Sequence, residues 1–465
     1  MKQRIAAGTD PIEATARPTF TTSFAAITAM IGVAVGLGNF WRFPYLVGRF
    51  GGAAFVLFYL LLVVVIGIPG LMAEWSLGRH TGRGTVGAFE RARFPFGRAT
   101  GWFFFTIVMA SSAYYSVAVG WVLCFALAPL VRLVIPAFDP ASALPPETGF
   151  DPRSFLLQVM CLALVLGCAA LVLVRGLRSG IEAVSRHLVP LLFVALIIVI
   201  VRGLTLPGSF EGLHWYLLKF QLSDLTGEVM VAALGQVVFS LSLGGTFMVV
   251  YGSYLDRREN LARDAIATAG ADTAAGLLAG LAIFPAVFAF GLEPGSGPGL
   301  IFDTLPRVFN AMPGGALFSI LFFAALFFAA LLSAIAAFEV LVVGLTDNTS
   351  LQRRSAVPIV IAIVTLLAVP PMINMGIFVP WDLTFGSGMQ TLGAALAVIA
   401  FAWCLDRSAA LRQLAAPGAG PDTEPAVTRL TIFLYYWLRY VVPGGILLVG
   451  VWWLLTEVLH VAGGV

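Results

Sequence analysis

The chain has 465 residues, of which 27 are Lys or Arg and 24 are Asp or Glu, so charged side chains make up only 11%. Soluble domains carry about 25% charged residues, and this chain has too few charges to cover a water-soluble globule of its size. Hydrophobic residues make up 59%, which is enough for on the order of ten membrane helices of about 20 residues each. The small net charge of +3 argues against nucleic acid as a partner. We therefore expect an all-α polytopic membrane protein in a lipid bilayer.

Uncharged apolar runs predict eleven transmembrane helices, and these runs are much longer than the segments of about ten residues that a β-barrel uses. They cover residues 19–48, 53–78, 99–131, 154–174, 181–201, 227–255, 262–291, 315–345, 356–370, 379–405 and 430–458. Arginines gather in the loops that a cytoplasmic N-terminus would leave inside. The positive-inside rule therefore predicts a multi-pass protein of the cell membrane with its N-terminus inside and its C-terminus outside.

Two of the predicted helices contain clusters that interrupt a regular helix. Residues 32–39 (GVAVGLGN) lie in the middle of the first helix, and residues 240–246 (SLSLGGT) lie at a similar depth in the sixth. Glycines alone would fit close helix packing, but both clusters also carry hydroxyl or amide side chains. Broken helices five apart are typical of inverted-repeat transporters, in which freed carbonyls bind cations and half-helix N-termini bind anionic groups. We predict a 5+5 inverted-repeat fold with discontinuous first and sixth helices and one extra C-terminal helix.

The predicted organisation has five parts along the chain. They are a cytoplasmic N-terminal segment (1–18), a first repeat with helices one to five (19–205), a second repeat with helices six to ten (206–407), a cytoplasmic linker (408–429), and helix eleven with an extracellular C-terminus (430–465). Pro and Gly punctuate the linker, as expected of an irregular connection. Residues 293–314 start with Gly and Pro and have an apolar middle, so we expect them to fold back as an extracellular lid.

Residues 36–44 (GLGNFWRFP) resemble the signature of the neurotransmitter:sodium symporter family. Further matches are GGAAF at 51–55, GIP at 67–69 followed by Glu74, YY at 114–115, GQ at 235–236, FSLSLG at 239–244, YGSY at 251–254, IFPA at 283–286 and FFAA at 327–330. The similarity covers essentially the whole chain, and the eleven helices resemble the shorter bacterial members. This resemblance implies a sodium-coupled symporter that imports an amino acid by alternating access.

In that family the amino acid lies with two sodium ions between the broken helices and the third and eighth helices. By resemblance, the first sodium ion would bind the Ala34 carbonyl, Asn39, Ser240 and Asp272. Amide, hydroxyl, carboxylate and carbonyl oxygens suit a hard cation. A carboxylate inside a membrane helix costs about 2.5–3.5 kcal/mol on insertion scales, so we expect Asp272 to have a partner.

The residue at position 272 is also relevant to whether transport depends on chloride. Many family members have Asn where this chain has Asp272, and the chloride-dependent members bind the anion beside it. A fixed carboxylate can supply that negative charge, so we predict chloride-independent transport. The side chains of Tyr59, Gln236 and Ser240 nevertheless match other positions of the family's chloride site.

At the second sodium site the sequence departs from the family pattern. The resemblance assigns the carbonyls of Gly32, Val35 and Ala329 and two polar side chains of the eighth helix to this ion. This chain has Leu332 and Ser333 at those two positions, and Leu332 offers no oxygen. Either the second ion binds weakly or the stoichiometry differs, so the sequence predicts one or two sodium ions.

The substrate site is also implied by the resemblance. The backbone N–H groups of Leu37 and Gly38 and the Tyr115 hydroxyl would bind the substrate carboxylate, with Phe239 as an aromatic lid. Ala34 and Ser240 would lie beside it. The side-chain pocket would be lined by Val33, Ser111, Ser112, Ser242, Gly245, Ser333 and Ala337. Several of these are small, which favours a bulky apolar or aromatic amino acid such as tryptophan, tyrosine, phenylalanine or leucine.

The resemblance also implies two gates, one on each side of the substrate site. Arg42 and Asp382, the latter at the start of the tenth helix, match the extracellular ion-pair gate. The inner gate would be formed by Arg17, Ser253, Tyr254 and Asp347, with Phe20 where the family commonly has Trp.

Two alternatives to transport are a membrane-embedded enzyme and a transport-deficient protein on the same scaffold. A membrane-embedded enzyme is disfavoured because the four histidines lie near helix ends or in loops, and the sequence has no HExxH or GxSxG motif, so we expect no catalytic residues. A transport-deficient amino-acid sensor or partner protein on the same scaffold stays open, since Leu332 is the kind of change that a disabled ion site would show. The sequence leaves the oligomeric state open.

Overall fold

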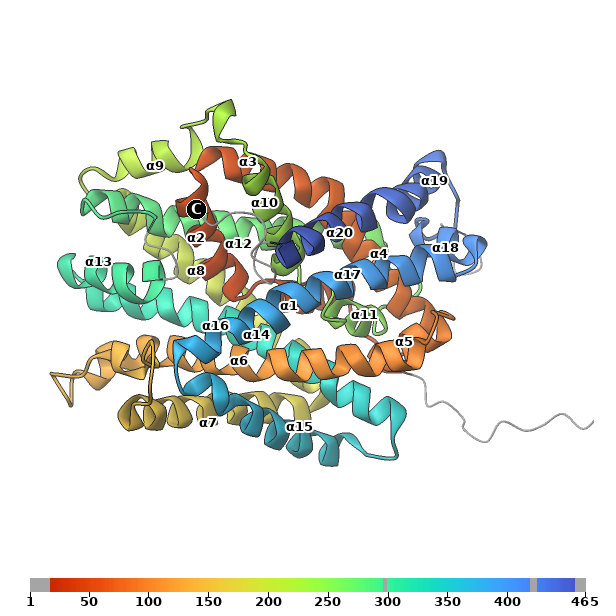
Figure 1. Ribbon diagram of the computed structural model, residues 1–465, viewed down its shortest axis with the longest axis horizontal. Helices are drawn as coiled ribbons and strands as arrows, with labels where there is room; N and C mark the ends of the chain where they lie inside the picture. Colours follow the sequence, from red (N-terminus) through yellow and green to blue (C-terminus); the bar gives the residue numbers. More distant parts are fainter. Residues whose placement is uncertain (1–16, 296–298, 419–424, 456–465) are drawn as a thin grey trace, which may run out of the picture.

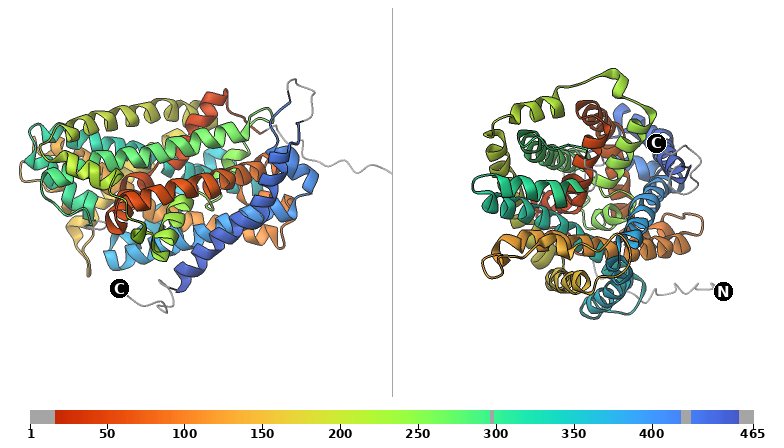
Figure 2. Two further views of the ribbon diagram at one scale, coloured as in Figure 1. Left: turned by 90° about the horizontal axis from the view of Figure 1, so that it is seen from above. Right: turned by 60° about the vertical axis from the view of Figure 1, so that its left-hand side comes forward.

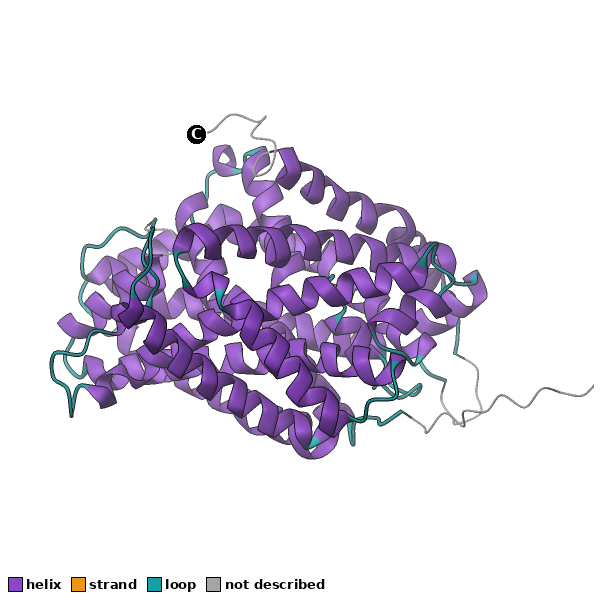
Figure 3. Cartoon of the chain, turned by 60° about the horizontal axis from the view of Figure 1, so that its bottom comes forward, coloured by secondary structure: helices purple, strands orange, loops and turns teal. Residues whose placement is uncertain are grey.

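The computed structural model describes residues 17–295, 299–418 and 425–455, which form a bundle of long helices (Figure 1). This described part contains helices and connections without a strand, apart from one isolated β-bridge between Ala416 and Ala426 (Figure 3). Helices satisfy every backbone hydrogen bond within the segment, as a membrane interior without water requires. The expected all-α polytopic membrane fold is confirmed. Most of the predicted N-terminal segment, part of the linker and the C-terminal end lie outside the described residues.

Eight helices of the described part are long and apolar enough to cross a membrane. They are Ala53–Thr81 (α3, η2 and α4), Gly97–Val131 (α6), Pro152–Val174 (α7), Leu177–Leu204 (η4 and α8), Leu261–Ala289 (α12), Gly315–Asn348 (α14), Met375–Cys404 (α16, η8, α17 and η9) and Arg429–Trp452 (α19, η10 and α20). A ninth span is the pair Ser23–Ala34 (α1) and Gly38–Phe50 (η1 and α2), which is bent by 54°.

In two of the predicted spans, no single helix is long enough to cross a membrane. The sixth is split into α10 (Gly227–Ser240) and α11 (Phe247–Gly252). The ninth is α15 (Arg353–Ala368), which has 16 residues. Each of the eleven predicted runs therefore has a helical counterpart in the structure. The first and sixth are the discontinuous ones, as the glycine clusters predicted.

Some connections contain structure that the sequence analysis missed. Short helices form in four of them, at Thr85–Arg91 (α5), Ser209–Leu217 (α9), Leu305–Ala311 (α13) and Arg407–Leu414 (α18). The expected lid thus contains α13 and the preceding turn Leu300–Thr304 (η6), while residues 296–298 lie outside the described part. The tenth span begins at Met375, so Asp382 lies well inside it rather than at its start.

The long continuous helices surround the broken ones. α6 and α14 pack along each other, and α1 packs against α8, α12 and α14. The view in which many helices are seen end on shows the first helix inside the bundle, with later helices on all sides (Figure 2). The breaks are therefore buried in protein, which is the condition for irregular backbone at membrane depth.

The break of the sixth helix has a strained backbone. Ser242, Gly244 and Thr246 have φ values of 53°, 87° and 57°, and non-glycine residues in this region cost about 1–3 kcal/mol each. Side-chain hydrogen bonds hold the conformation. The Ser242 hydroxyl donates to the Val33 carbonyl at 3.0 Å, and the Gly244 N–H donates to Glu74 Oε1 at 2.7 Å. The surrounding helices thus fix the break in one geometry.

Candidate functional site

The break of the first helix leaves backbone groups that side chains satisfy. Asn39 Oδ1 accepts a hydrogen bond from the Gly36 N–H at 2.9 Å, and Gln236 Nε2 donates to the Gly38 carbonyl at 2.9 Å. The Leu37 N–H donates to the Tyr115 hydroxyl at 3.4 Å. Two of the three predicted donors to a substrate carboxylate, the Leu37 N–H and the Tyr115 hydroxyl, therefore lie side by side. Gln236 also links the two broken helices directly, a role that the motif alone did not reveal.

Three predicted ligands of the first sodium ion meet in one buried cluster. Asn39 Nδ2 donates to Asp272 Oδ1 at 2.7 Å, to the Asp272 carbonyl at 2.9 Å and to Ser240 Oγ at 3.0 Å. The Ser240 hydroxyl donates to Asp272 Oδ2 at 2.7 Å. All three residues are at most 1% exposed. The amide nitrogen of Asn39 thus occupies a position surrounded by carboxylate, carbonyl and hydroxyl oxygens, the ligand types that a hard cation prefers.

Beside this cluster lies a central cavity of about 60 Å³. Its lining includes eleven of the thirteen predicted substrate-site residues: Val33, Ala34, Leu37, Gly38, Ser111, Ser112, Tyr115, Phe239, Ser242, Ser333 and Ala337. Its wall also contains Gly36, Tyr114, Phe247 and Gln390, which the sequence analysis did not predict.

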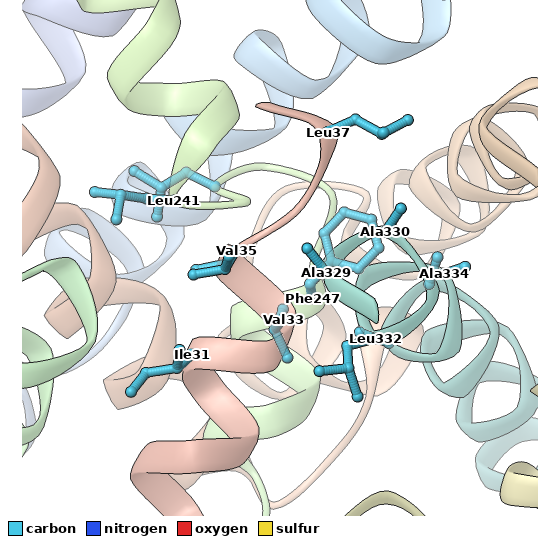
Figure 4. Close-up of a cluster of buried hydrophobic side chains, with 14 of the residues drawn as sticks. Ile31, Val33, Val35, Leu37, Leu241, Phe247, Ala329, Ala330, Leu332 and Ala334 are labelled. Carbon is cyan, nitrogen blue, oxygen red and sulfur yellow. The ribbon is translucent and has the colours of Figure 1, made fainter. Parts of the chain in front are cut away.

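The two remaining predicted residues do not line this cavity. Ser240 faces the ion cluster, as its bond to Asp272 shows. Gly245 is covered by the ring of Phe247, which lies only 1.9 Å from the position of a Cβ atom built on that glycine. Phe247 thus fills the space that the missing side chain leaves, and Figure 4 shows its ring between the first-helix break and Ala329 and Ala330 of α14. The small side chains therefore leave less volume than expected.

The region of the second predicted sodium site is closed by an apolar side chain. Leu332 is 4% exposed, and its Cδ1 lies 3.3 Å from the position of a Cβ atom on Gly32. Figure 4 shows Leu332 reaching from α14 toward the end of α1, near Val33. The Ser333 hydroxyl bonds the carbonyls of Val33 and Val35 at 3.2 and 3.1 Å. The other two predicted carbonyl ligands belong to Gly32 and Ala329, which are both buried.

A second cavity of about 300 Å³, the vestibule, lies next to the central cavity. The two share Leu37, Tyr114, Tyr115 and Phe239 as wall residues. Arg42 and Asp382 both line the vestibule, but none of the ion pairs in the described part joins them. Arg42 instead donates to the Ser387 hydroxyl at 3.0 Å and lies over the Phe239 ring, 4.5 Å from its centre.

The opposite side is closed by ion pairs and hydrogen bonds. Arg17 pairs with Asp347 at 2.7 Å and also lies over the ring of Tyr254. The Tyr254 hydroxyl donates to Glu339 Oε1 at 2.6 Å, and Arg353 pairs with the same carboxylate. The structure thus brings together three of the four predicted inner-gate residues.

The hydroxyl of the fourth residue, Ser253, donates to the Val250 carbonyl and to no gate residue of the described part. Sequence reasoning missed Glu339 and Arg353. The one signal in the sequence was a glutamate inside the long apolar run of the eighth helix, because such a charge needs a partner.

Comparisons with known proteins identify one family. A profile of the "Sodium:neurotransmitter symporter family" matches residues 17–134 and 154–413, well over half of the chain. The chain belongs to this family. It is therefore a sodium-dependent transporter and not an enzyme.

Relatives of the symporter family extend over most of the chain. A sodium-dependent transporter of Bacillus subtilis, YhdH, is 33% identical over 442 residues, which are 91% of this chain and 94% of the relative. One from Haemophilus influenzae is 32% identical over 77% of this chain and 80% of its own length. The solved structure of MhsT in complex with L-phenylalanine has a TM-score of 0.79 and 32% identity, and covers 94% of this chain and 99% of that one.

Proposed function

We propose that the chain imports an amino acid together with sodium across the cell membrane by alternating access. The observation that carries this proposal is the cluster of Asn39, Ser240 and Asp272, which joins both helix breaks beside the central cavity. A cation there would face a substrate carboxylate held at Leu37 and Tyr115. Each ligand would then favour binding of the other, which couples the two fluxes.

The substrate proposed is a bulky apolar or aromatic amino acid. The complex of MhsT with L-phenylalanine supports this class, because that protein shares the fold and 32% of its aligned residues. Two phenylalanine rings, Phe239 and Phe247, stand in the cavity wall. A large side chain fits if the ring of Phe239, which separates the cavity from the vestibule, moves aside.

The proposed coupling uses one sodium ion and no chloride. Asn39, Ser240 and Asp272 would offer amide, hydroxyl and carboxylate oxygens to the first ion, whereas the second site would lack a ligand at Leu332, whose side chain has no oxygen. The Asp272 carboxylate supplies the fixed negative charge that chloride would otherwise bring. Both statements deepen the family assignment, and each is tested separately below.

Alternation would use the two gates. Arg42 and Asp382 would close the vestibule once substrate is bound, and Arg17 with Asp347 would release on the other side. By the positive-inside rule, the side with Arg17 and the N-terminus is cytoplasmic.

Reconstituted vesicles test the proposal. An inward sodium gradient should drive accumulation of a labelled aromatic amino acid, and replacement of sodium by potassium should abolish it. Replacement of chloride by gluconate should leave the rate unchanged. Binding without uptake of any amino acid would instead support the transport-deficient sensor, which Leu332 keeps as the second candidate.

A further inference from the structure

The serine hydroxyl groups around the central cavity already donate their hydrogens to backbone carbonyls. Ser111 and Ser112 donate to the Val108 carbonyl at 3.1 and 2.6 Å, and Ser242 donates to the Val33 carbonyl at 3.0 Å. Ser333 likewise bonds first-helix carbonyls. A hydroxyl has one hydrogen, so these four residues offer a ligand acceptor lone pairs only.

Gln390 differs from these residues. It lies on α17 (Met389–Ile399), is half-buried, and lines both the central cavity and a smaller cavity beside Arg42 and Phe239. Its side chain makes no hydrogen bond with any residue in the described part of the chain. A carboxamide has two donor hydrogens and an acceptor oxygen. This amide therefore holds unused hydrogen-bonding capacity in the cavity wall.

The backbone places Gln390 against the break of the sixth helix. Its carbonyl oxygen lies 1.7 Å from the position of a Cβ atom on Gly244, so only a glycine permits this contact. Gln390 lines the central cavity together with Ser242 and Phe247, and it lies on a different helix from the donors at Leu37 and Tyr115. It is thus a polar group of the cavity wall additional to those that would bind the substrate carboxylate.

We propose that Gln390 is a specificity-determining residue that bonds an N–H or O–H group on an aromatic substrate side chain, so that the site favours tyrosine and tryptophan over phenylalanine and leucine. This inference rests on the proposed function. An apolar side chain that covered the amide would leave a buried polar group without a partner, which is costly. Sites with such a group reject analogues that lack the matching hydroxyl or amine. The ring of Phe247 supplies an aromatic contact that all three aromatic substrates share.

Tyrosine and phenylalanine are the sharpest pair of probes, because they differ by one hydroxyl. Equilibrium binding of both to the purified full-length protein in sodium buffer gives the ratio of their dissociation constants. We expect the wild type to prefer tyrosine by about tenfold, the effect of one unsatisfied buried group. In Gln390→Leu that ratio should fall to about one, with phenylalanine bound at least as tightly as by the wild type.

Two further variants keep the test decisive. Gln390→Glu retains an acceptor oxygen and should keep the tyrosine preference, even if Gln390→Leu proves unstable. Thr391→Val changes the next residue, whose hydroxyl bonds the Ser387 carbonyl within the helix, and should leave the ratio unchanged.

A wild type without tyrosine preference would overturn the inference. An equal loss of both ligands in Gln390→Leu would also overturn it, because that result assigns Gln390 to the gate with Arg42 and Ser387. Failure of all amino acids to bind the wild type would contradict the proposed function itself, and the inference with it.

Discussion

At the scale of single residues, Asp272 is a buried carboxylate that needs a partner. Its carboxylate is fully buried and is held by Asn39 and Ser240 in a segment that the sequence marks as transmembrane. A charge at this depth is costly unless it is paired, and removal of one partner of a buried pair typically costs about 3–5 kcal/mol. A monovalent cation between the three residues would balance the charge. This is the physical reason to place sodium there.

The variant Asp272→Asn tests this assignment. The amide keeps the size of the side chain and removes its charge, so we expect the sodium concentration for half-maximal uptake to rise at least about tenfold, which corresponds to 1.4 kcal/mol. Chloride should then stimulate uptake, because an anion could restore the missing charge. Uptake is measured in sodium chloride and in sodium gluconate. An unchanged sodium dependence in both salts would contradict the assignment.

A second prediction concerns the substitution of Leu332. Leu332→Thr puts a hydroxyl beside the Gly32 and Ser333 positions, and with the Val35 and Ala329 carbonyls it would complete an oxygen set for a second ion. The Hill coefficient of sodium-dependent uptake should rise from about one toward two. Leu331→Thr, at the adjacent buried position, is the matched control and should leave the coefficient unchanged. A coefficient near two in the wild type would show that Leu332 does not disable the site.

At the scale of elements, the break of the sixth helix organises the site. It brings Ser240 to the ion cluster, Ser242 to the first helix, and Phe247 into the cavity. The Gly244 N–H donates to the carboxylate of Glu74 from the second span, and the backbone carbonyl of Gln390 from the tenth span packs against Gly244. Residues of the first, second, sixth and tenth spans therefore contact one another at this break.

Gly244→Ala should disrupt this junction. Its φ of 87° is left-handed, which costs a non-glycine residue about 1–2 kcal/mol, and the added Cβ would lie 1.7 Å from the Gln390 carbonyl. We expect loss of substrate binding and a clearly lower thermal denaturation midpoint.

Gly270→Ala in α12 is the control for this variant. No atom lies within 4 Å of the added Cβ there, so stability should be equal or slightly higher, because alanine has a better helix propensity. Equal stability of the two variants would contradict the geometry of the break.

The sequence predicted these elements because the signals for them are local. Apolar runs located the helices, and glycine clusters with hydroxyl and amide side chains located both breaks. Phe247 and Gln390 could not be found in this way, since their positions in the cavity depend on contacts between the sixth and tenth spans. The family motif also placed Gly245 in the pocket, and only the packed structure shows that Phe247 covers it. The short helix α9 was missed because it lies in a connection with polar residues.

At the scale of the whole molecule, the two sides of the cavity differ. The side with Arg42 has an open vestibule, whereas the other side is closed by Arg17 with Asp347 and by the network of Glu339, Tyr254 and Arg353. Alternating access requires that one side of the cavity is closed while the other is accessible. The contacts that close a side must then be broken with free energy from the binding of substrate and ion. Glu339 is fully buried, so its carboxylate depends on the Arg353 cation and the Tyr254 hydroxyl as partners.

Arg353→Ala should therefore shift the molecule toward opening on the closed side. Loss of this cation leaves the Glu339 carboxylate with only the Tyr254 hydroxyl, at a typical cost of about 3–5 kcal/mol. Hydrogen–deuterium exchange of residues 17–34 should increase. The control is Arg307→Ala, which removes an exposed pair with Asp303 and should change nothing. Equal exchange in both variants would mean that the network does not keep this side closed.

Sodium-driven uptake of tyrosine into vesicles that contain the purified protein is the most direct test of sodium-coupled transport. We expect accumulation above the outside concentration when sodium is high outside, none when potassium replaces sodium, and a strongly weakened sodium response in Asp272→Asn. Uptake that proceeds equally well without sodium, or tyrosine binding with no uptake under any gradient, would contradict it.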